Sequence, residues 1–241
     1  MDGWSPVALN PDGGNKMAEQ MTQEQIDWQV RVNKGTAKTN NDIFEKQGYL
    51  VIRDLIDPKE LYCEVPNIRG QINYYGKLEK FSHTPVEMQV EGSLARYYYP
   101  PYKESYFKVK KRLENIVGKP LSTTYYYDRY YFPSMELKKH ADRDACEISV
   151  SIHIGSNLKD KWGFKLIDVE GNEKELFLNP GDGLLYKGCE LCHWRDPMPG
   201  KRRNKIRKWL GMEEYYYHQV FMHYILRDGL RAHCANDMSR N

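Results

Sequence analysis

The sequence contains no apolar run that approaches the roughly 18 residues of a membrane-spanning helix, although 40% of its 241 residues are hydrophobic. Its first residues show neither a basic region nor the apolar stretch that follows one in a secretory signal. A Gly-rich phosphate-binding loop and an internal repeat are also missing. These absences predict a globular, cytoplasmic protein with no membrane partner.

Cysteine is scarce and forms no disulfide pattern. The five cysteines are odd in number and scattered along the chain. Small secreted domains that depend on disulfides carry dense, paired cysteines, whereas thiols stay reduced in the cytosol. We therefore expect free thiols.

The two signs of charge nearly balance, with 36 basic and 33 acidic residues, and the excess is local. Residues 196–214 contain six Lys or Arg and three Asp or Glu, which leaves 30 of each sign elsewhere. These cations stand beside Trp209 and Tyr215–Tyr217, a combination that can contact phosphates and stack on bases. One interpretation is a non-enzymatic β-sandwich module whose segment 201–217 binds an anionic partner, nucleic acid included. The other is a solvated loop, or a lid beside an active site.

The order of the predicted elements indicates a tail followed by one domain. Residues 1–40 predict a flexible tail with a short helix, and residues 41–241 a single domain with a basic insertion at about 201–214. Apolar positions three and four apart predict a helix over residues 103–117. Segments rich in Tyr, Val, Ile and Phe then predict strands at 123–132, 147–154, 164–169, 175–178, 183–187 and 218–226. This pattern predicts a mainly β (α+β) jelly roll with helices packed on its outside.

Two histidines and an aspartate form the strongest chemical pattern. In His140-Ala141-Asp142, residues i and i+2 of a strand would point to one face, roughly 7 Å apart. His193 follows a later predicted strand. Two imidazoles and one carboxylate on one side of a metal leave open positions opposite, as in non-haem Fe(II) oxygenases. The alternative is that His140 and Asp142 are surface residues at a strand end.

In this order the motifs resemble the 2-oxoglutarate/Fe(II)-dependent dioxygenases, on the prolyl-hydroxylase-like and phytanoyl-CoA-hydroxylase-like side of that superfamily. The resemblance covers about residues 41–229. Four stretches carry it: residues 41–56, Arg129-Tyr130-Tyr131 ahead of the first histidine, Asn179–Tyr186, and Gln219–Tyr224.

The resemblance implies a double-stranded β-helix with Fe(II) held by His140, Asp142 and His193. It also implies 2-oxoglutarate and O2 as cosubstrates, and it allows a role for ascorbate. The activity it implies is hydroxylation of a C–H bond in a small molecule or peptide, such as a prolyl or other amino-acid residue, coupled to decarboxylation of 2-oxoglutarate to succinate.

The resemblance further implies a basic residue that pairs with the far carboxylate of 2-oxoglutarate. The family places it about nine or ten residues after the distal histidine, a window that here holds Lys201, Arg202 and Arg203. Lys201 fits a family-like Pro…Gly-Lys arrangement, but a charged insertion separates these residues from the next strand. Arg195 is two residues after His193 and would share its face of an extended strand. Arg195 is therefore the preferred candidate, with Lys201 second; the alternative for Arg195 is a surface ion pair.

Two further positions follow from matching this sequence to the family. Tyr131 resembles a tyrosine that hydrogen-bonds the cosubstrate; the alternative is packing, which among 19 tyrosines is the commoner role of any one of them. Ser151 alternates with Ser149 and His153 on one strand face, which the resemblance turns inward. The alternative is a half-polar strand face in contact with water.

Cys189-Glu190-Leu191-Cys192-His193 also matches C-x-x-C-H, the haem-attachment string of c-type cytochromes. Haem attachment goes with export, and a strand-rich chain is unlike a helical cytochrome. One cysteine pair is also too few for a closed structural zinc site. The dioxygenase interpretation is therefore preferred.

Overall fold

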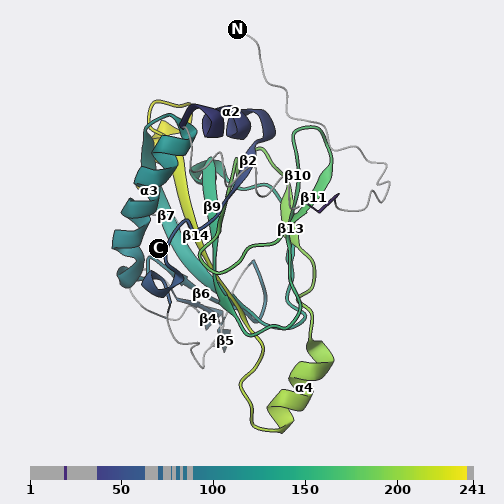
Figure 1. The fold of residues 1–241 in the computed structure, drawn as a ribbon. Coiled ribbons are helices and arrows are strands. Elements are labelled where there is room, and N and C mark those ends of the chain that lie inside the picture. The colour runs from purple at the N-terminus through teal and green to yellow at the C-terminus, as the bar shows by residue number, and fades with distance from the viewer. Residues whose placement is uncertain are drawn as a thin grey trace.

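Two β-sheets of unequal size form the centre of the computed structural model (Figure 1). It describes residues 19–20, 37–62, 70–72, 77, 80–81, 84–85 and 89–237. The larger sheet contains, in spatial order, β2 (Tyr49–Ile52), β12 (Gly183–Tyr186), β9 (Ile148–Ser156), β14 (Tyr217–Leu226), β7 (Leu121–Tyr131), β6 (Leu94–Tyr97) and β3 (Gly70–Ile72). The smaller sheet contains β1 (Glu19–Gln20), β11 (Glu173–Leu176), β10 (Phe164–Ile167), β13 (His193–Arg195) and β8 (Leu137–His140). A separate two-stranded sheet pairs β4 (Lys80–Phe81) with β5 (Thr84–Pro85).

The prediction of a mainly β chain is confirmed. All six predicted strands are present, and each of their ends lies within two residues of the predicted one. Apart from the short β1–β11 and β3–β6 pairs, the strands pair antiparallel. The predicted tail, residues 1–40, falls almost wholly outside the described residues, which leaves its expected short helix untested.

Helix α3 (Lys103–Val117) has the bounds that its periodicity predicts and lies along the larger sheet (Figure 1). Tyr106, Val109, Leu113 and Ile116 are buried, and the helix ends where Gly118 adopts a left-handed conformation with φ 69°. Two hydrogen bonds fasten it to β14: Tyr106 Oη donates to the carbonyl of His223 at 2.6 Å, and Tyr224 Oη donates to that of Tyr106 at 2.8 Å. Tyrosine therefore supplies both packing area and polar anchors in this core.

Helix α2 (Ala37–Gln47) leads directly into β2. A single 3-10 turn, η1 (Pro58–Glu60), follows β2 and is capped by the Asp57 carboxylate, which accepts from the Lys59 amide. Among the described residues, no helix is both long enough and apolar enough to cross a membrane.

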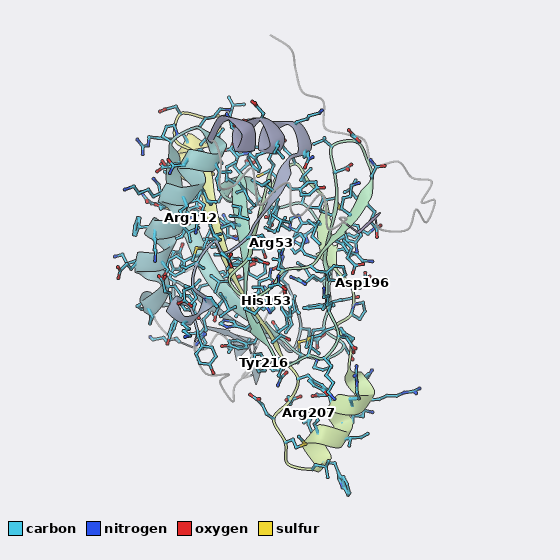
Figure 2. All side chains as sticks on the ribbon, in the orientation of Figure 1. Arg53, Arg112, His153, Asp196, Arg207 and Tyr216 are labelled. Carbon is cyan, nitrogen blue, oxygen red and sulfur yellow. The ribbon has the colours of Figure 1, made fainter. Side chains whose placement is uncertain are left out.

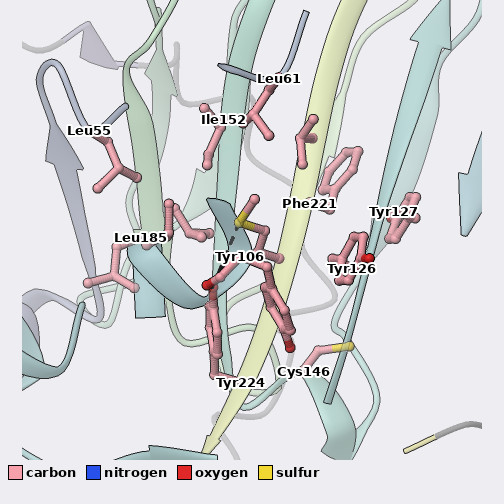
Figure 3. Close-up of a cluster of buried hydrophobic side chains, with 14 of the residues drawn as sticks. Leu55, Leu61, Tyr106, Tyr126, Tyr127, Cys146, Ile152, Leu185, Phe221 and Tyr224 are labelled. Carbon is pink, nitrogen blue, oxygen red and sulfur yellow. Dashed lines mark hydrogen bonds between the residues drawn. The ribbon is translucent and has the colours of Figure 1, made fainter. Parts of the chain in front are cut away.

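The hydrophobic core is rich in aromatic rings and lies on both faces of the larger sheet. Successive residues of β7 point to opposite faces, so Tyr127 stacks on Phe221 at 4.7 Å while Tyr126 packs against Tyr106 at 4.8 Å (Figure 3). A second cluster joins the two sheets through β2, β10, β11 and β12. The sheets are thus held face to face by apolar burial.

One buried ionic network lies on the α3 side of the larger sheet. The carboxylate of Asp128, which is fully buried, accepts from the guanidinium of Arg96 and from His218 Nε2 at 2.9 Å. Burial raises the pKa of Asp128, but the hydrogen bond from His218 and the Arg96 charge outweigh it, so the pKa is lowered overall. The aspartate therefore stays ionised inside the core.

The basic insertion is structured rather than a loop. Residues 201–209 form helix α4 (Lys201–Trp209), which projects away from both sheets between β13 and β14 (Figure 1). Of the four aromatic residues expected to form a stacking surface, Tyr215 and Tyr217 are buried, Tyr216 is partly buried and Trp209 is exposed. The interpretation that the tyrosines at 215 and 217 stack on bases is therefore wrong.

Candidate metal centre

The two histidines of the predicted triad lie on neighbouring strands of the smaller sheet. His140 is the last residue of β8 and His193 the first of β13, and the two are paired in register. Asp142 lies beyond β8 rather than on it, so the expectation that the His-x-Asp pair shares one strand face is wrong in detail. A hydrogen bond from the Asp142 amide to the carbonyl of Gly188, 2.8 Å long, turns the chain back toward β13.

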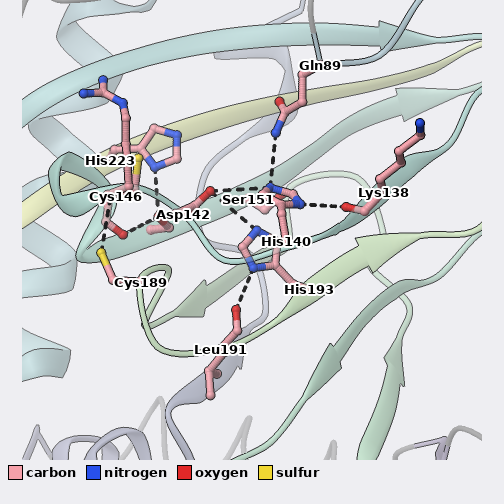
Figure 4. Close-up of polar contacts among 12 residues, drawn as sticks. Gln89, Lys138, His140, Asp142, Cys146, Ser151, Cys189, Leu191, His193 and His223 are labelled. Atoms are coloured by element: carbon pink, nitrogen blue, oxygen red, sulfur yellow. Dashed lines mark hydrogen bonds and ion pairs between the residues drawn. The ribbon is translucent and has the colours of Figure 1, made fainter. Parts of the chain in front are cut away.

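This turn brings the three side chains together (Figure 4). The Nε2 atoms of His140 and His193 each lie 3.6 Å from Asp142 Oδ1, and the two imidazole centroids are 4.4 Å apart. Separations of this size match ligand atoms around one ion at metal–ligand distances of about 2 Å. The donor set therefore fits a single divalent metal.

Backbone hydrogen bonds orient both imidazoles. His140 Nδ1 donates to the carbonyl of Lys138 at 2.7 Å, and His193 Nδ1 donates to that of Leu191 at 2.9 Å. Since a carbonyl can only accept, the proton of each neutral ring is on Nδ1, and the Nε2 lone pair faces Asp142. This is the tautomer that a metal requires on that side.

The charges of the triad are set by burial and by mutual contact. Burial raises the pKa of Asp142, but the hydrogen bond with His140 and the nearby imidazoles lower it below its usual range. Burial lowers the pKa of His140, yet the contact with Asp142 gives a net increase; in His193, burial prevails and the pKa is lowered. The centre thus holds an ionised carboxylate beside a neutral His193.

A second group of potential ligands shares the aspartate. Asp142, Cys146 and His223 also have ligand atoms within 4.8 Å of one another. The Ser149 hydroxyl connects them, because its Oγ lies 3.2 Å from Asp142 Oδ2 and 2.8 Å from His223 Nδ1. Burial raises the pKa of Cys146 well above its usual range, which keeps the thiol protonated and makes it a poor ligand. We therefore take the His140–Asp142–His193 set as the candidate centre.

Gly188 lines the side of Asp142 that faces away from the histidines. A Cβ on this residue would lie 2.6 Å from Asp142 Oδ2 and 2.7 Å from Ser149 Oγ, closer than atoms can pack. The absence of a side chain therefore creates the space in which the aspartate carboxylate lies.

Arg195 is buried between the sheets, two residues beyond His193. Its Nη1 donates to the carbonyl of Trp162 at 3.0 Å, and its Nη2 lies 3.4 Å from Tyr217 Oη. Its Nε has no hydrogen-bond partner among the described residues, and none of their carboxylates pairs with the guanidinium. A buried cation without a counter-ion is costly unless an anion binds there.

Of the other three residues predicted to bind the cosubstrate, two are buried and one is exposed. Tyr131 is fully buried, and its hydroxyl lies 3.4 Å from Arg129 Nη1. Ser151 is buried and accepts a hydrogen bond from Gln219 Nε2. Lys201 is exposed at the start of α4 and does not join the buried group.

The strand face that carries Ser149, Ser151 and His153 points inward, as the match to the family indicated (Figure 2 labels His153). The alternative of a water-facing strand is therefore wrong. His153 Nδ1 donates to the carbonyl of Leu178 at 2.9 Å, and the ring stacks on Tyr217 at 4.2 Å. Burial lowers the pKa of His153 to about 4, so this imidazole is neutral.

Sequence reasoning missed two residues of the centre. Gln89 Nε2 lies 3.1 Å from His140 Nε2, and Gly188 lies against the aspartate carboxylate. Gln89 lies in a stretch with no recognisable pattern, and nothing in the sequence alone would have indicated it. Gly188 lies at the start of the connection between β12 and β13. Its position immediately before the Cys-x-x-Cys-His string was the one sequence signal that could have indicated a role near His193.

No model of a known protein family matches the chain, and no curated protein sequence matches it. Solved structures do match. A 2OG-Fe(II) oxygenase family oxidoreductase from Burkholderia pseudomallei superposes with a TM-score of 0.56 at 10% identity, covering 94% of this chain and 100% of that one. A Pseudomonas putida prolyl-4-hydroxylase gives 0.51 at 11% identity, covering 78% and 98%.

This chain has the oxygenase fold. HygX from Streptomyces hygroscopicus, solved with nickel, 2-oxoglutarate and hygromycin B bound, shares it at a TM-score of 0.50 and 12% identity, over 85% of this chain and 87% of that one. The resemblance stated from the sequence motifs is thereby confirmed at the level of the fold. Identities this low transfer the architecture and leave activity to be argued from the site.

Proposed function

We propose that this protein is an Fe(II)- and 2-oxoglutarate-dependent dioxygenase that hydroxylates a C–H bond of a small-molecule or peptide substrate. The convergence of His140 Nε2, Asp142 Oδ1 and His193 Nε2 within the oxygenase fold is the observation that carries the proposal. We also infer that the two facing sheets form the double-stranded β-helix of that fold.

The triad would hold Fe(II) through these three atoms. Neutral imidazoles and a carboxylate suit Fe(II), and one such face leaves positions open on the other. When bound, the metal with 2-oxoglutarate supplies O2 activation coupled to oxidative decarboxylation. The protein's part is to fix the ligands through the backbone acceptors at Lys138 and Leu191 and through Gly188.

Arg195 would bind the far carboxylate of 2-oxoglutarate. It follows His193 on the same short strand, is buried, and lacks a carboxylate partner among the described residues. Guanidinium–carboxylate hydrogen bonds are charge-assisted and stronger in a low-dielectric interior. Tyr131 and Ser151 would line the same interior. Lys201 is exposed, which argues against it as the residue that binds the far carboxylate.

Aromatic side chains would exclude water around the cosubstrate. Phe164 stacks on His193 with centroids 5.5 Å apart, and Arg195 lies over the rings of Trp162 and Tyr217 at 4.6 and 4.7 Å. These rings leave the guanidinium edge as the polar group available to an anion. A dry, preorganised interior strengthens such contacts and limits side reactions.

The ligand at position 142 favours hydroxylation over halogenation, because an aspartate there fills the position that a halide would need. Other structures with this fold are described as an epimerase, SnoN, and a carbocyclase, SnoK, so the fold alone does not decide the outcome. The mass of the product is therefore the decisive measurement.

The test combines metal binding with turnover. Purified protein with Fe(II), 2-oxoglutarate and a substrate panel should form succinate and a product heavier by one oxygen atom. Asp142→Ala and His193→Ala should each abolish metal binding and succinate formation while preserving the circular dichroism spectrum. Succinate formation that persists in both variants would refute the ligand assignment.

A further inference from the structure

Helix α4 turns its apolar side to solvent and a polar residue toward the rest of the protein. Its buried residue is the polar Asn204, whereas Ile206 is 57% and Trp209 84% exposed. The exposed apolar surface continues just past the helix in Leu210 and Met212. A helix at the surface of a soluble protein normally buries its apolar stripe. A cluster of large apolar side chains that faces solvent marks an interaction site.

Specific contacts fix this orientation. Asn204 Oδ1 accepts from the Tyr215 amide at 2.8 Å, and Asn204 Nδ2 donates to Glu214 Oε2 at 2.9 Å. Arg207 Nε donates to the carbonyl of Glu213 at 2.7 Å (Figure 2 labels Arg207). The polar side of α4 is therefore fastened to residues 213–215, and the apolar side cannot turn inward. The surface is preformed, so a partner need not order it.

Cations share the exposed side. Arg202, Lys205, Ile206 and Trp209 are three or four residues apart and so lie on one side of the helix. Neither Arg202 nor Lys205 forms an ion pair among the described residues, whereas Arg203 pairs with Asp160. A symmetric contact between two copies would bring like charges together, so the charge pattern favours an anionic partner.

We propose that this tip surface, formed by Arg202, Lys205, Ile206, Trp209, Leu210 and Met212, binds the headgroup region of an anionic phospholipid bilayer. Tryptophan and aliphatic side chains enter the boundary between headgroups and acyl chains, while Lys and Arg contact lipid phosphates and carboxylates. Such binding needs no membrane-spanning segment. Single-stranded nucleic acid fits less well, because Trp209 lacks neighbouring exposed rings: Tyr215 and Tyr217 are buried.

Vesicle cosedimentation of the full chain tests the proposal, using phosphatidylcholine vesicles with and without phosphatidylserine. We expect binding that requires phosphatidylserine, weakens with salt, and shifts the tryptophan emission to shorter wavelength. The double variant Trp209→Ala, Leu210→Ala should weaken binding about tenfold or more, and Arg202→Gln with Lys205→Gln should remove the phosphatidylserine preference.

The matched control is Leu230→Ala, an equally apolar residue that is 95% exposed beyond the opposite end of β14. It should bind vesicles as the wild type does. The proposal is overturned by absent vesicle binding at low salt, by equal binding to both lipids, or by unchanged binding of the Trp209 variant. Two alternative partners would also overturn it. If the protein does not bind vesicles, and the Trp209→Ala, Leu210→Ala variant instead dissociates a dimer or loses binding to an oligonucleotide, then the surface binds a second copy or nucleic acid. Metal and 2-oxoglutarate affinities should stay unchanged throughout, so this test is independent of the proposed chemistry.

Discussion

Asp142 and Gly188 are in contact through both backbone and side chain. The Asp142 amide donates to the Gly188 carbonyl at 2.8 Å, and Asp142 Oδ2 occupies space that a Cβ on residue 188 would require. The glycine thus fixes where the aspartate backbone turns and where its carboxylate lies. The geometry of the candidate metal centre depends on this pair as much as on the two histidines.

Gly188→Ala is expected to displace the Asp142 carboxylate. The new Cβ would overlap the Cys146 carbonyl oxygen and lie 2.6 Å from Asp142 Oδ2, so the backbone there and the carboxylate beside the histidines must both shift. We expect Fe(II) or Co(II) affinity to fall about 10- to 100-fold, the range seen when groups that orient metal ligands are changed. Isothermal titration calorimetry with Co(II) measures this.

Gly155→Ala is the matched control for that substitution. Gly155 lies near the opposite end of β9 from Ser149, and a Cβ there meets nothing within 4 Å. Its metal affinity should equal that of the wild type. Equal loss in both variants would indicate general destabilisation instead of a specific role for residue 188.

Ser149→Ala should weaken metal binding through the other oxygen of the aspartate. The Ser149 hydroxyl lies 3.2 Å from Asp142 Oδ2 and is the polar link to His223. Without it the carboxylate loses an orienting hydrogen bond, and we expect about a tenfold lower affinity. Ser156→Ala, on the same strand but bonded to the Tyr216 carbonyl, should have no effect on Co(II) titrations.

Arg195→Ala should weaken 2-oxoglutarate binding and leave metal binding intact. A charged hydrogen bond lost from a buried site lowers affinity about 10- to 100-fold. The loss should vanish for 2-oxopentanoate, which has the same chain length but no far carboxylate. Calorimetry on the metal-loaded protein with each acid measures both affinities. Lys201→Ala serves as the comparison; a larger effect there than at Arg195 would reverse the assignment.

Asp128→Asn should destabilise the fold in a pH-dependent way. The buried Asp128 has a lowered pKa, so its ionised form stabilises the folded state above the ordinary carboxyl pKa of about 3.9, and this stabilisation is lost as pH falls through the lowered value. Removing its charge leaves the Arg96 guanidinium without its counter-ion, at a cost of about 3–5 kcal/mol.

Urea denaturation across pH measures that difference. The gap in unfolding free energy between wild type and Asp128→Asn should be constant near neutral pH and shrink below about pH 4. The control, Asp160→Asn, removes an exposed ion pair with Arg203 and should cost less than about 1 kcal/mol at any pH. A gap that widened toward acid would contradict the assignment of an ionised Asp128.

The sequence alone determined the elements and the chemistry that the chain offers. Periodicity predicted helix α3 residue for residue and each major strand to within two residues, because apolar spacing and glycine or proline turns act locally. The order of motifs indicated the oxygenase fold and singled out His140, Asp142 and His193. Residue alternation also placed Arg195 on the buried face of His193, since that relation spans only two residues.

Only the tertiary structure decided how distant segments meet. Asp142 lies beyond the end of β8 and faces a space that Gly188 keeps open. This placement depends on a contact between segments far apart in the chain. The same holds for α4, whose composition suggested a solvated loop: Asn204, bonded to Glu214 and Tyr215, determines that Trp209 faces outward. Local sequence patterns predict which face of a helix or strand is apolar. Long-range hydrogen bonds and packing determine whether that face contacts the core or solvent.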